Sequence, residues 1–253
     1  MRIGHRLVRH RILGGHHLLI LRLNHIQHVF FDLDRTLWDF ESNSRSTLEE
    51  LFSEFQLAQI LGVSAHRFIH EYQRINEIFW EEYRNGIIDK KHLRHGRFEA
   101  ALKYFNHADA QLAADIGEQY IHRSPRKTAL IPLSIEVLEY LKPNYHLHII
   151  TNGFEEVQHV KMQSSGLTPY FQHIITSESA GAKKPSPLIF THAQQLTGAT
   201  ATNSIMIGDH FQADVQGAIN AGWKAVFFEP ELPKTEEADY LHIHSLNELK
   251  DFL

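Results

Sequence analysis

The chain has 253 residues and a formal net charge of -5 when its 20 histidines are counted as neutral. This length can bury a sizeable core and suggests one domain with an insertion, or two small domains. The acidic balance argues against a nucleic-acid polymer as a partner, because phosphate backbones are bound by basic surfaces. The absence of cysteine excludes disulfides, thiolate zinc sites and a cysteine nucleophile. It also fits a reducing cytoplasm, which is the expected location.

Residues 1–25 are predicted to form a disordered N-terminal extension. The segment is basic and rich in histidine, and its apolar runs are too short for a secretory signal. An amphipathic targeting peptide is the alternative interpretation. No stretch of the chain is long and apolar enough to span a bilayer, so no membrane partner is expected. The histidines elsewhere are scattered and lack a helical ligand spacing, which favours surface and packing roles.

The first predicted strand is the run His28-Val-Phe-Phe-Asp-Leu33, which is short, apolar and rich in aromatic residues. It ends abruptly in polar residues, with Asp32 and Asp34 two positions apart. Open α/β sheets place ligands at the carboxyl ends of their strands. The acids therefore indicate a site at this strand end.

The next segment, 43–123, is predicted to be an inserted helical domain. It shows four helix-like patterns without a convincing strand, and Phe68, Tyr72, Ile75 and Phe79 recur at helical spacing. The predicted core domain therefore consists of residues 26–42 and 124–253.

From about Ile131 onward, predicted helices and strands alternate, which is typical of a parallel sheet covered on both faces. Gly166 and Gly222 end two of the helices, and Ser245 with Glu248 forms a capping box for a last helix. The fold class is thus α/β, a Rossmann-like parallel sheet with an inserted helical domain. The predicted strands are 146–151, 172–176, 204–207 and 224–228, and the predicted helices are 133–141, 155–165, 187–196 and 213–221.

Polar clusters follow four of the predicted strands, and a parallel sheet brings such strand ends together. They are Asp32 with Asp34, Thr151-Asn152-Gly153, Lys183-Lys184-Pro185, and Gly208-Asp209 with Asp214. Four carboxylates in one crevice repel one another unless a cation is present. Oxygen ligands without cysteine or a histidine set favour Mg²⁺, which commonly bridges to a phosphate.

This constellation can support phosphoryl transfer. A carboxylate can act as the nucleophile, and a second can protonate the leaving oxygen and then activate water. The lysine and the Thr/Asn donors can stabilise the charged oxygens. Each piece alone has an ordinary explanation, such as a turn, a helix cap or a solvated charge pair. Their order along the chain, each at a strand end, favours the catalytic interpretation.

These motifs resemble those of the haloacid-dehalogenase superfamily. Phe-Phe-Asp-Leu-Asp-Arg-Thr-Leu is similar to its first motif, and Thr151 matches the second. The Lys184-Pro185 pair matches the third motif, and Gly208-Asp209 with Asp214 matches the fourth. The resemblance covers about residue 26 to the C-terminus and places the helical insertion where members of this group carry a cap.

The resemblance implies a role for each matching residue. Asp32 is the implied nucleophile, and Asp34 is the implied general acid and base. Asp32, Asp209 and the backbone carbonyl of Asp34 are the implied Mg²⁺ ligands, and Asp214 supports the metal shell and Lys184. The implied phosphate-binding residues are Thr151, Asn152 and Lys184, and Lys184 also holds the charge of the nucleophile.

The second acid, Asp34, separates phosphatases from the dehalogenases that name the superfamily, which lack it. A finer match at residues 36–42, 151–154 and 208–214 is similar to bacterial pyrimidine 5′-nucleotidases with a helical cap. The expected substrate is a small phosphate ester, first of all a pyrimidine nucleoside monophosphate, and the protein is expected to be a monomer or homodimer. A sugar phosphatase and a non-catalytic binding protein are the alternatives.

Four aromatic residues are candidates for stacking on a base, although helical spacing favours packing inside the insertion. They are Phe40, Phe79, Trp80 and Tyr83. Two residues depart from the common motifs. Arg35 is expected to alter only the local charge, and His210 is expected to be a neutral bystander.

Overall fold

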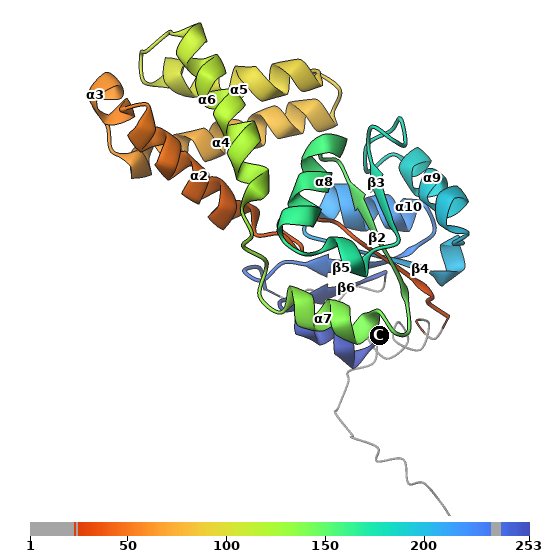
Figure 1. Ribbon diagram of the computed structural model, residues 1–253. Helices are drawn as coiled ribbons and strands as arrows, with labels where there is room; N and C mark the ends of the chain where they lie inside the picture. The colour runs from red at the N-terminus through yellow and green to blue at the C-terminus, as the bar shows by residue number, and fades with distance from the viewer. Residues whose placement is uncertain (1–22, 24, 234–238) are drawn as a thin grey trace, which may run out of the picture.

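The computed structural model describes residues 23, 25–233 and 239–253 (Figure 1). Its centre is a six-stranded sheet in the order β3-β2-β1-β4-β5-β6, in which every neighbouring pair is parallel. The strands are β1 His28–Phe31, β2 His146–Thr151, β3 His173–Thr176, β4 Ser204–Gly208, β5 Lys224–Phe228 and β6 Tyr240–Ile243.

Helices cover both faces of this sheet, so alternate residues of each strand enter two separate cores. Val29 and Phe31 pack on one face, and Phe30 packs on the other. This explains why the strands read as continuous apolar runs. The first face is covered by α7 Ser134–Leu141, α8 Glu155–Ser164 and the 3-10 helix η5 Leu246–Asp251. The second is covered by α9 Pro187–Thr197, the π-helix η4 Phe211–Gln216 and α10 Gly217–Asn220. Short 3-10 helices, η2 Thr168–Tyr170 and η3 Ala201–Asn203, lie between these elements.

A separate helical region projects from this α/β region between β1 and β2 (Figure 1). It consists of α2 Phe40–Glu54, α3 Leu57–Leu61, α4 Ala65–Arg84, α5 Lys90–Tyr104, α6 Ala110–Arg123 and η1 Ser124–Arg126. The four long helices begin at side chains that accept a hydrogen bond from the first turn, namely Asp39, Ser64, Asp89 and Asp109. The region has its own apolar core, whose largest buried members include Phe68, Tyr72 and Phe98.

The predicted fold class is confirmed, and the differences are local. Strand β6 was not predicted, because four residues at a sheet edge give a weak periodic signal. The predicted helix 213–221 is instead a π-helix followed by one short α-helix. The capping box of Ser245 and Glu248 is present, and it begins a 3-10 helix.

The predicted division into domains stays a prediction, and its first boundary, between residues 42 and 43, falls inside α2. Of the predicted extension 1–25, residues 1–22 and 24 lie outside the described part of the chain. No helix in the described part is long and apolar enough to cross a membrane.

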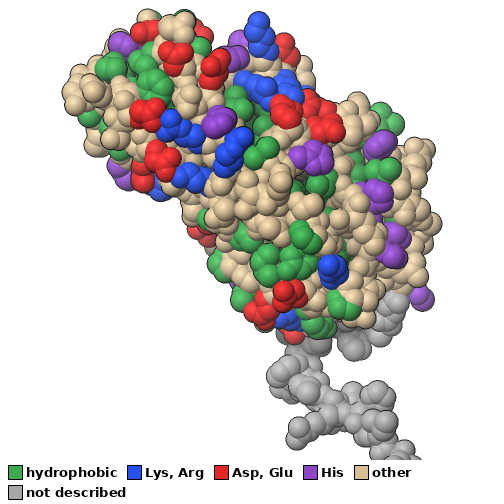
Figure 2. Space-filling model, viewed as in Figure 1, with side chains coloured by type: hydrophobic (Ala, Val, Ile, Leu, Met, Phe, Trp, Pro, Cys, Tyr) green, Lys and Arg blue, Asp and Glu red, His purple; other side chains and the backbone are tan. Residues whose placement is uncertain are grey.

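Charged side chains are unevenly distributed over the surface. Figure 2 shows Lys, Arg, Asp and Glu gathered on the helical region and along its junction with the α/β region. On the same face, histidines lie along one side of the α/β region. The junction is therefore a charged seam, and the cavity described next opens along it.

Candidate active site

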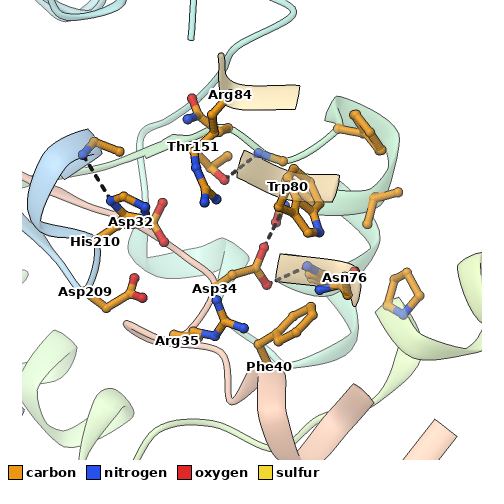
Figure 3. A pocket seen from close by; sticks show the side chains of 18 of the residues that line it. Asp32, Asp34, Arg35, Phe40, Asn76, Trp80, Arg84, Thr151, Asp209 and His210 are labelled. Carbon is orange, nitrogen blue, oxygen red and sulfur yellow. Dashed lines mark hydrogen bonds and ion pairs between the residues drawn. The ribbon is translucent and has the colours of Figure 1, made fainter. Parts of the chain in front are cut away.

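The carboxyl ends of β1, β2 and β4 meet in one cavity with the residues predicted from the motifs (Figure 3). Asp32 directly follows β1, and its carboxylate lies 2.6 Å from Lys184 Nζ. Lys184 is almost fully buried, and its ammonium group also contacts Asp214 Oδ1 at 2.6 Å and donates to the Ile150 carbonyl at 2.7 Å. One buried cation thus holds two buried carboxylates together.

Gly208 makes the approach of Asp214 to the strand end possible. A Cβ atom at Gly208 would lie 2.2 Å from Asp214 Oδ2, closer than any real contact. The same oxygen accepts the backbone N–H of His210 at 3.0 Å. His210 in turn accepts from Ala213 N–H through Nδ1, so its ring caps the following helix. The expectation that His210 is a neutral bystander agrees with this contact and with burial, which lowers the pKa of His210.

Three side chains form a carboxylate cluster that fits a divalent cation. Ligand atoms of Asp32, Asp209 and Asp214 all lie within 4.8 Å of one another. Thr36 fixes Asp209, since its hydroxyl donates to Asp209 Oδ1 at 3.2 Å and accepts the Asp209 N–H at 3.1 Å. An all-oxygen donor set of this kind suits Mg²⁺ better than a softer metal.

The crowding of these buried carboxylates shifts their pKa values. Burial raises the pKa of Asp32 to about 7, although Lys184 opposes the shift and Asp214 adds to it. Burial also raises the pKa of Asp209 well above its usual range, and the neighbouring Asp32 and Asp214 raise it further. For Lys184, burial alone would lower the pKa, but the carboxylates of Asp214 and Asp32 raise it above its ordinary value. The ammonium group of Lys184 therefore stays charged, whereas the carboxylates need a further cation to ionise fully.

Asp34 enters the same cavity but has different partners. Its carboxylate accepts from Gln158 Nε2 at 3.0 Å and from Lys161 Nζ at 2.5 Å, and both donors come from α8. Lys161 is buried with its ammonium group 4.4 Å from the centre of the Trp38 ring. Neither donor was predicted, because no short motif marks them.

The predicted phosphate-binding residues also line the cavity, with one qualification for Asn152. Thr151 ends β2 and is buried, and its hydroxyl oxygen accepts the Gly153 N–H at 3.0 Å. The Asn152 side chain is occupied by the Lys184 backbone, donating to its carbonyl at 2.9 Å and accepting its N–H at 2.8 Å. Its side chain therefore positions the Lys184 loop, and its backbone N–H is the group left for a phosphate.

The helical region supplies a second wall, of which sequence reasoning named Trp80 as a candidate and missed Asn76 and Arg84. Asn76, Trp80 and Arg84 recur every four residues along α4, and all three line the cavity (Figure 3). Arg84 has neither a hydrogen-bond nor an ion-pair partner among the described residues, and burial lowers its pKa. The signal for these residues was the four-residue spacing, but a cavity wall and a packed core give the same period.

The four aromatic candidates divide between the two interpretations. Phe40 and Trp80 line the cavity, whereas Phe79 and Tyr83 do not. Tyr83 is buried and meets Phe154 edge to face, and Phe79 stacks on His92. Packing therefore explains Phe79 and Tyr83, whereas Trp80 both packs against Phe154 and lines the cavity.

Arg35 joins the two regions, which goes beyond the expected change of local charge. It follows Asp34 with a left-handed backbone (φ 66°), and its guanidinium bonds Glu41 on α2 at 2.8 Å and Glu77 on α4. Both carboxylates raise its pKa against the effect of burial. The catalytic loop is thus tied to the wall formed by α4.

Comparisons with known proteins agree with this geometry. The haloacid dehalogenase-like hydrolase family matches residues 26–222. The chain is 31% identical over 228 residues to Pyrimidine 5′-nucleotidase YjjG of Escherichia coli (strain K12), covering 89% of this chain and 96% of that protein. It is 30% identical over 230 residues to ribulose-1,5-bisphosphate 5-phosphatase of Halopiger xanaduensis, covering 83% and 89%.

A solved structure extends the likeness to the whole fold. The HAD-hydrolase YfnB from Bacillus subtilis has a TM-score of 0.81 and 25% identity, with 90% of this chain and 98% of that chain covered. That structure is bound to magnesium and reveals interdomain movement.

Proposed function

This chain belongs to the haloacid dehalogenase-like hydrolases, and from that membership we propose that it is a Mg²⁺-dependent phosphatase of nucleoside 5′-monophosphates. The observation that carries the proposal is the placement of two carboxylates at the end of β1, of which Asp34 is the more exposed. Asp32 is buried against Lys184, and Asp34 lies two residues on, in the open cavity. One can attack phosphorus while the other handles the proton of the leaving alcohol.

Asp32 is the proposed nucleophile. Its carboxylate oxygen attacks the phosphorus atom, and the bond from phosphorus to the ester oxygen breaks as an aspartyl-phosphate forms. Asp34, protonated at this stage, gives its proton to the departing oxygen and becomes a carboxylate. In the second half Asp34 takes a proton from water, and the hydroxide attacks the aspartyl-phosphate. Phosphate is released and Asp32 is regenerated.

The other residues manage charge and position. Lys184 and the Thr151 hydroxyl are the proposed phosphate-binding groups, and Gln158 with Lys161 hold Asp34 in place. Asp32 and Asp209, with Asp214 close by, would hold the Mg²⁺. When bound, this ion would neutralise charge on the phosphoryl oxygens and allow Asp32 to ionise.

The nucleotide assignment is supported by the likeness to YjjG and by the flat aromatic wall of the cavity. A second candidate is a phosphatase of sugar phosphates. The 30% sequence identity to the ribulose-1,5-bisphosphate 5-phosphatase favours it. Arg84 also favours it, because this cation lines the cavity without an ion-pair partner among the described residues and suits a second anionic group.

The proposal is tested by phosphate release from purified protein with Mg²⁺. The panel holds pyrimidine and purine nucleoside monophosphates, sugar phosphates and an aryl phosphate, and Asp32→Asn serves as the control. A preference for pyrimidine monophosphates that disappears in Asp32→Asn would support the nucleotidase. Release from sugar phosphates alone would keep the mechanism and remove the nucleotide assignment. The absence of Asp32-dependent release from every ester would favour a non-catalytic binding protein.

A further inference from the structure

Helix α4 forms one side of the cavity. Arg84 lies at the catalytic end, close enough to Asp209 and His210 to influence them electrostatically. Asn76 lies eight residues earlier on the same face, about 12 Å away at the rise of an α-helix. Trp80 lies between them (Figure 3). A substrate lying along this wall reaches from the phosphoryl site to a distinct second end.

That second end contains a buried polar pair. Arg97 on α5 is 5% exposed and Asn76 is 2% exposed, and Arg97 Nη1 donates to Asn76 Oδ1 at 2.7 Å. Arg97 has no carboxylate partner in the described part of the chain, and its Nε is buried without any partner. Besides Asn76, the Tyr120 and Phe98 rings lie against its guanidinium, at 5.1 and 5.3 Å. A buried cation with so few partners is costly unless something else fills its bonding positions.

The pair offers the cavity only hydrogen-bond donors. The Asn76 oxygen is taken by Arg97, and the Asn76 amide nitrogen bonds none of the described residues. A guanidinium has donors and no acceptor. The complementary group is therefore an acceptor such as a carbonyl oxygen. Gln158, whose Nε2 donates to Asp34, also lines the cavity.

Trp80 indicates the shape of the ligand group that fits beside these donors. It stacks on Phe154 with ring centres 5.7 Å apart and meets Tyr83 edge to face at 5.8 Å, so its plane is fixed. A fixed aromatic face favours a flat ring over a puckered sugar. A pyrimidine base combines a flat ring, carbonyl acceptors and, in uracil, a ring N–H.

We propose that Asn76 and Arg97 form a subsite that recognises a ring carbonyl of a pyrimidine base, with Trp80 packed on the face of the ring. This inference rests on the proposed nucleotidase function and assigns its specificity to named residues of the helical region. The competing explanation is that Asn76 serves only to hold Arg97 in the core of that region. The two explanations differ in which substrates a variant affects.

The discriminating pair of substrates is uridine 5′-monophosphate and ribose 5-phosphate, which share the phosphate and the pentose and differ by the base. In Asn76→Ala, kcat/KM for uridine 5′-monophosphate is expected to fall about tenfold or more, since a lost bond leaves buried polar groups unpaired. The value for ribose 5-phosphate should change by less than about twofold, a shift within ordinary surface effects. An equal fall for both substrates, or no fall for either, would overturn the subsite.

Asn76→Asp covers the case in which Asn76→Ala fails to fold. The carboxylate keeps the shape and the contact with Arg97 but removes the N–H donor and adds a charge next to the carbonyl. The same loss, confined to uridine 5′-monophosphate, is expected. Ile78→Ala is the matched control, because Ile78 lies on the same helix, is 44% exposed and does not line the cavity.

A binding measurement separates this inference from the proposed function. Calorimetric titration of Asp32→Asn with uridine 5′-monophosphate, uridine and ribose 5-phosphate needs no turnover. Failure of phosphate release alone would remove the proposed function. Tighter binding of uridine 5′-monophosphate than of ribose 5-phosphate, lost in Asp32→Asn with Asn76→Asp, would still support the subsite. Equal binding of the two phosphates before Asn76 is changed would refute it.

Discussion

The α/β region and the helical region contribute charge to the same cavity in opposite ways. In the α/β region, Lys184 is buried between Asp32 and Asp214, and each of these three charges is held by another buried charge. Along the junction with the helical region, the ion pairs are partly exposed. Lys90 and Arg94, for example, both reach Glu156, whose side chain is 53% exposed. The cluster around Lys184 is therefore held by buried contacts, whereas the helical region that faces it is joined to the α/β region by partly exposed ion pairs.

This contrast predicts where stability resides. Replacing Lys184 with Met leaves two buried carboxylates without their cation, which should lower the free energy of unfolding by about 3–5 kcal/mol and abolish activity. Urea denaturation without Mg²⁺ would measure the effect. The control is Lys183→Met, next in the chain, whose ammonium group donates to the Tyr83 carbonyl of the helical region at 2.5 Å. It should cost only about 1 kcal/mol. Equal losses in the two variants would contradict the comparison.

The junction itself depends on an apolar contact more than on its charges. Phe154, which begins α8, is buried against Trp80 and Tyr83, with Lys90 and Arg94 over its ring. Phe154→Ala should cost about 3 kcal/mol. Because the lost contact joins the two regions, their unfolding should separate into two transitions in calorimetry. Leu188→Ala, which removes an apolar side chain that is 65% exposed, should leave a single transition. A single transition in Phe154→Ala would show that other contacts couple the regions.

Histidines sharpen the same comparison between buried and exposed groups. His28 and His148 share a hydrogen bond of 3.1 Å on one face of the sheet, and both are buried. Burial and the neighbouring histidines lower the pKa of His148 to about 3. Burial also lowers the pKa of His28. As the pH falls below about 6.5, these histidines therefore bind protons in the unfolded chain but not in the folded chain.

The contribution of these two histidines to stability should therefore be fully present above pH 6.5 and fall as the pH drops towards 3. The expected slope is about 1.4 kcal/mol per pH unit for each such histidine. Denaturant unfolding between pH 7 and 4.5 would measure it, with His148→Leu subtracted to remove the contribution of the carboxylates. His66→Leu, an exposed site on α4, should keep the full slope. A slope unchanged in His148→Leu would refute the assignment.

The two regions also differed in how far their sequence could be interpreted. Asp32, Thr151 and Asp209 lie at the carboxyl ends of β1, β2 and β4, so their meeting at one edge follows from a parallel sheet alone. Lys184, in the loop between β3 and α9, was predicted from its motif. The α4 residues Asn76 and Trp80 could not be assigned in this way. Their spacing is that of any amphipathic helix, and only the packing of α4 against α8 decides which face meets the cavity. Arg97 was missed for the same reason, since a lone arginine in a helix resembles a solvated charge.

The smallest expected effect belongs to the charged pairs of the junction. Glu156→Gln removes a carboxylate that Lys90 and Arg94 share, while Lys90 keeps its pair with Glu178. It should change the free energy of unfolding by less than about 1 kcal/mol, because exposed pairs are screened by water and salt. Raising the salt concentration should abolish even that difference, whereas it should leave the effect of Phe154→Ala intact. A loss as large as that of Phe154→Ala would mean that the exposed carboxylate, and not the aromatic contact, attaches the helical region. A small, salt-sensitive loss would mean that these pairs mainly set the orientation of α5 over the α/β region. Complementary charges across an interface can select one orientation even where they add little stability.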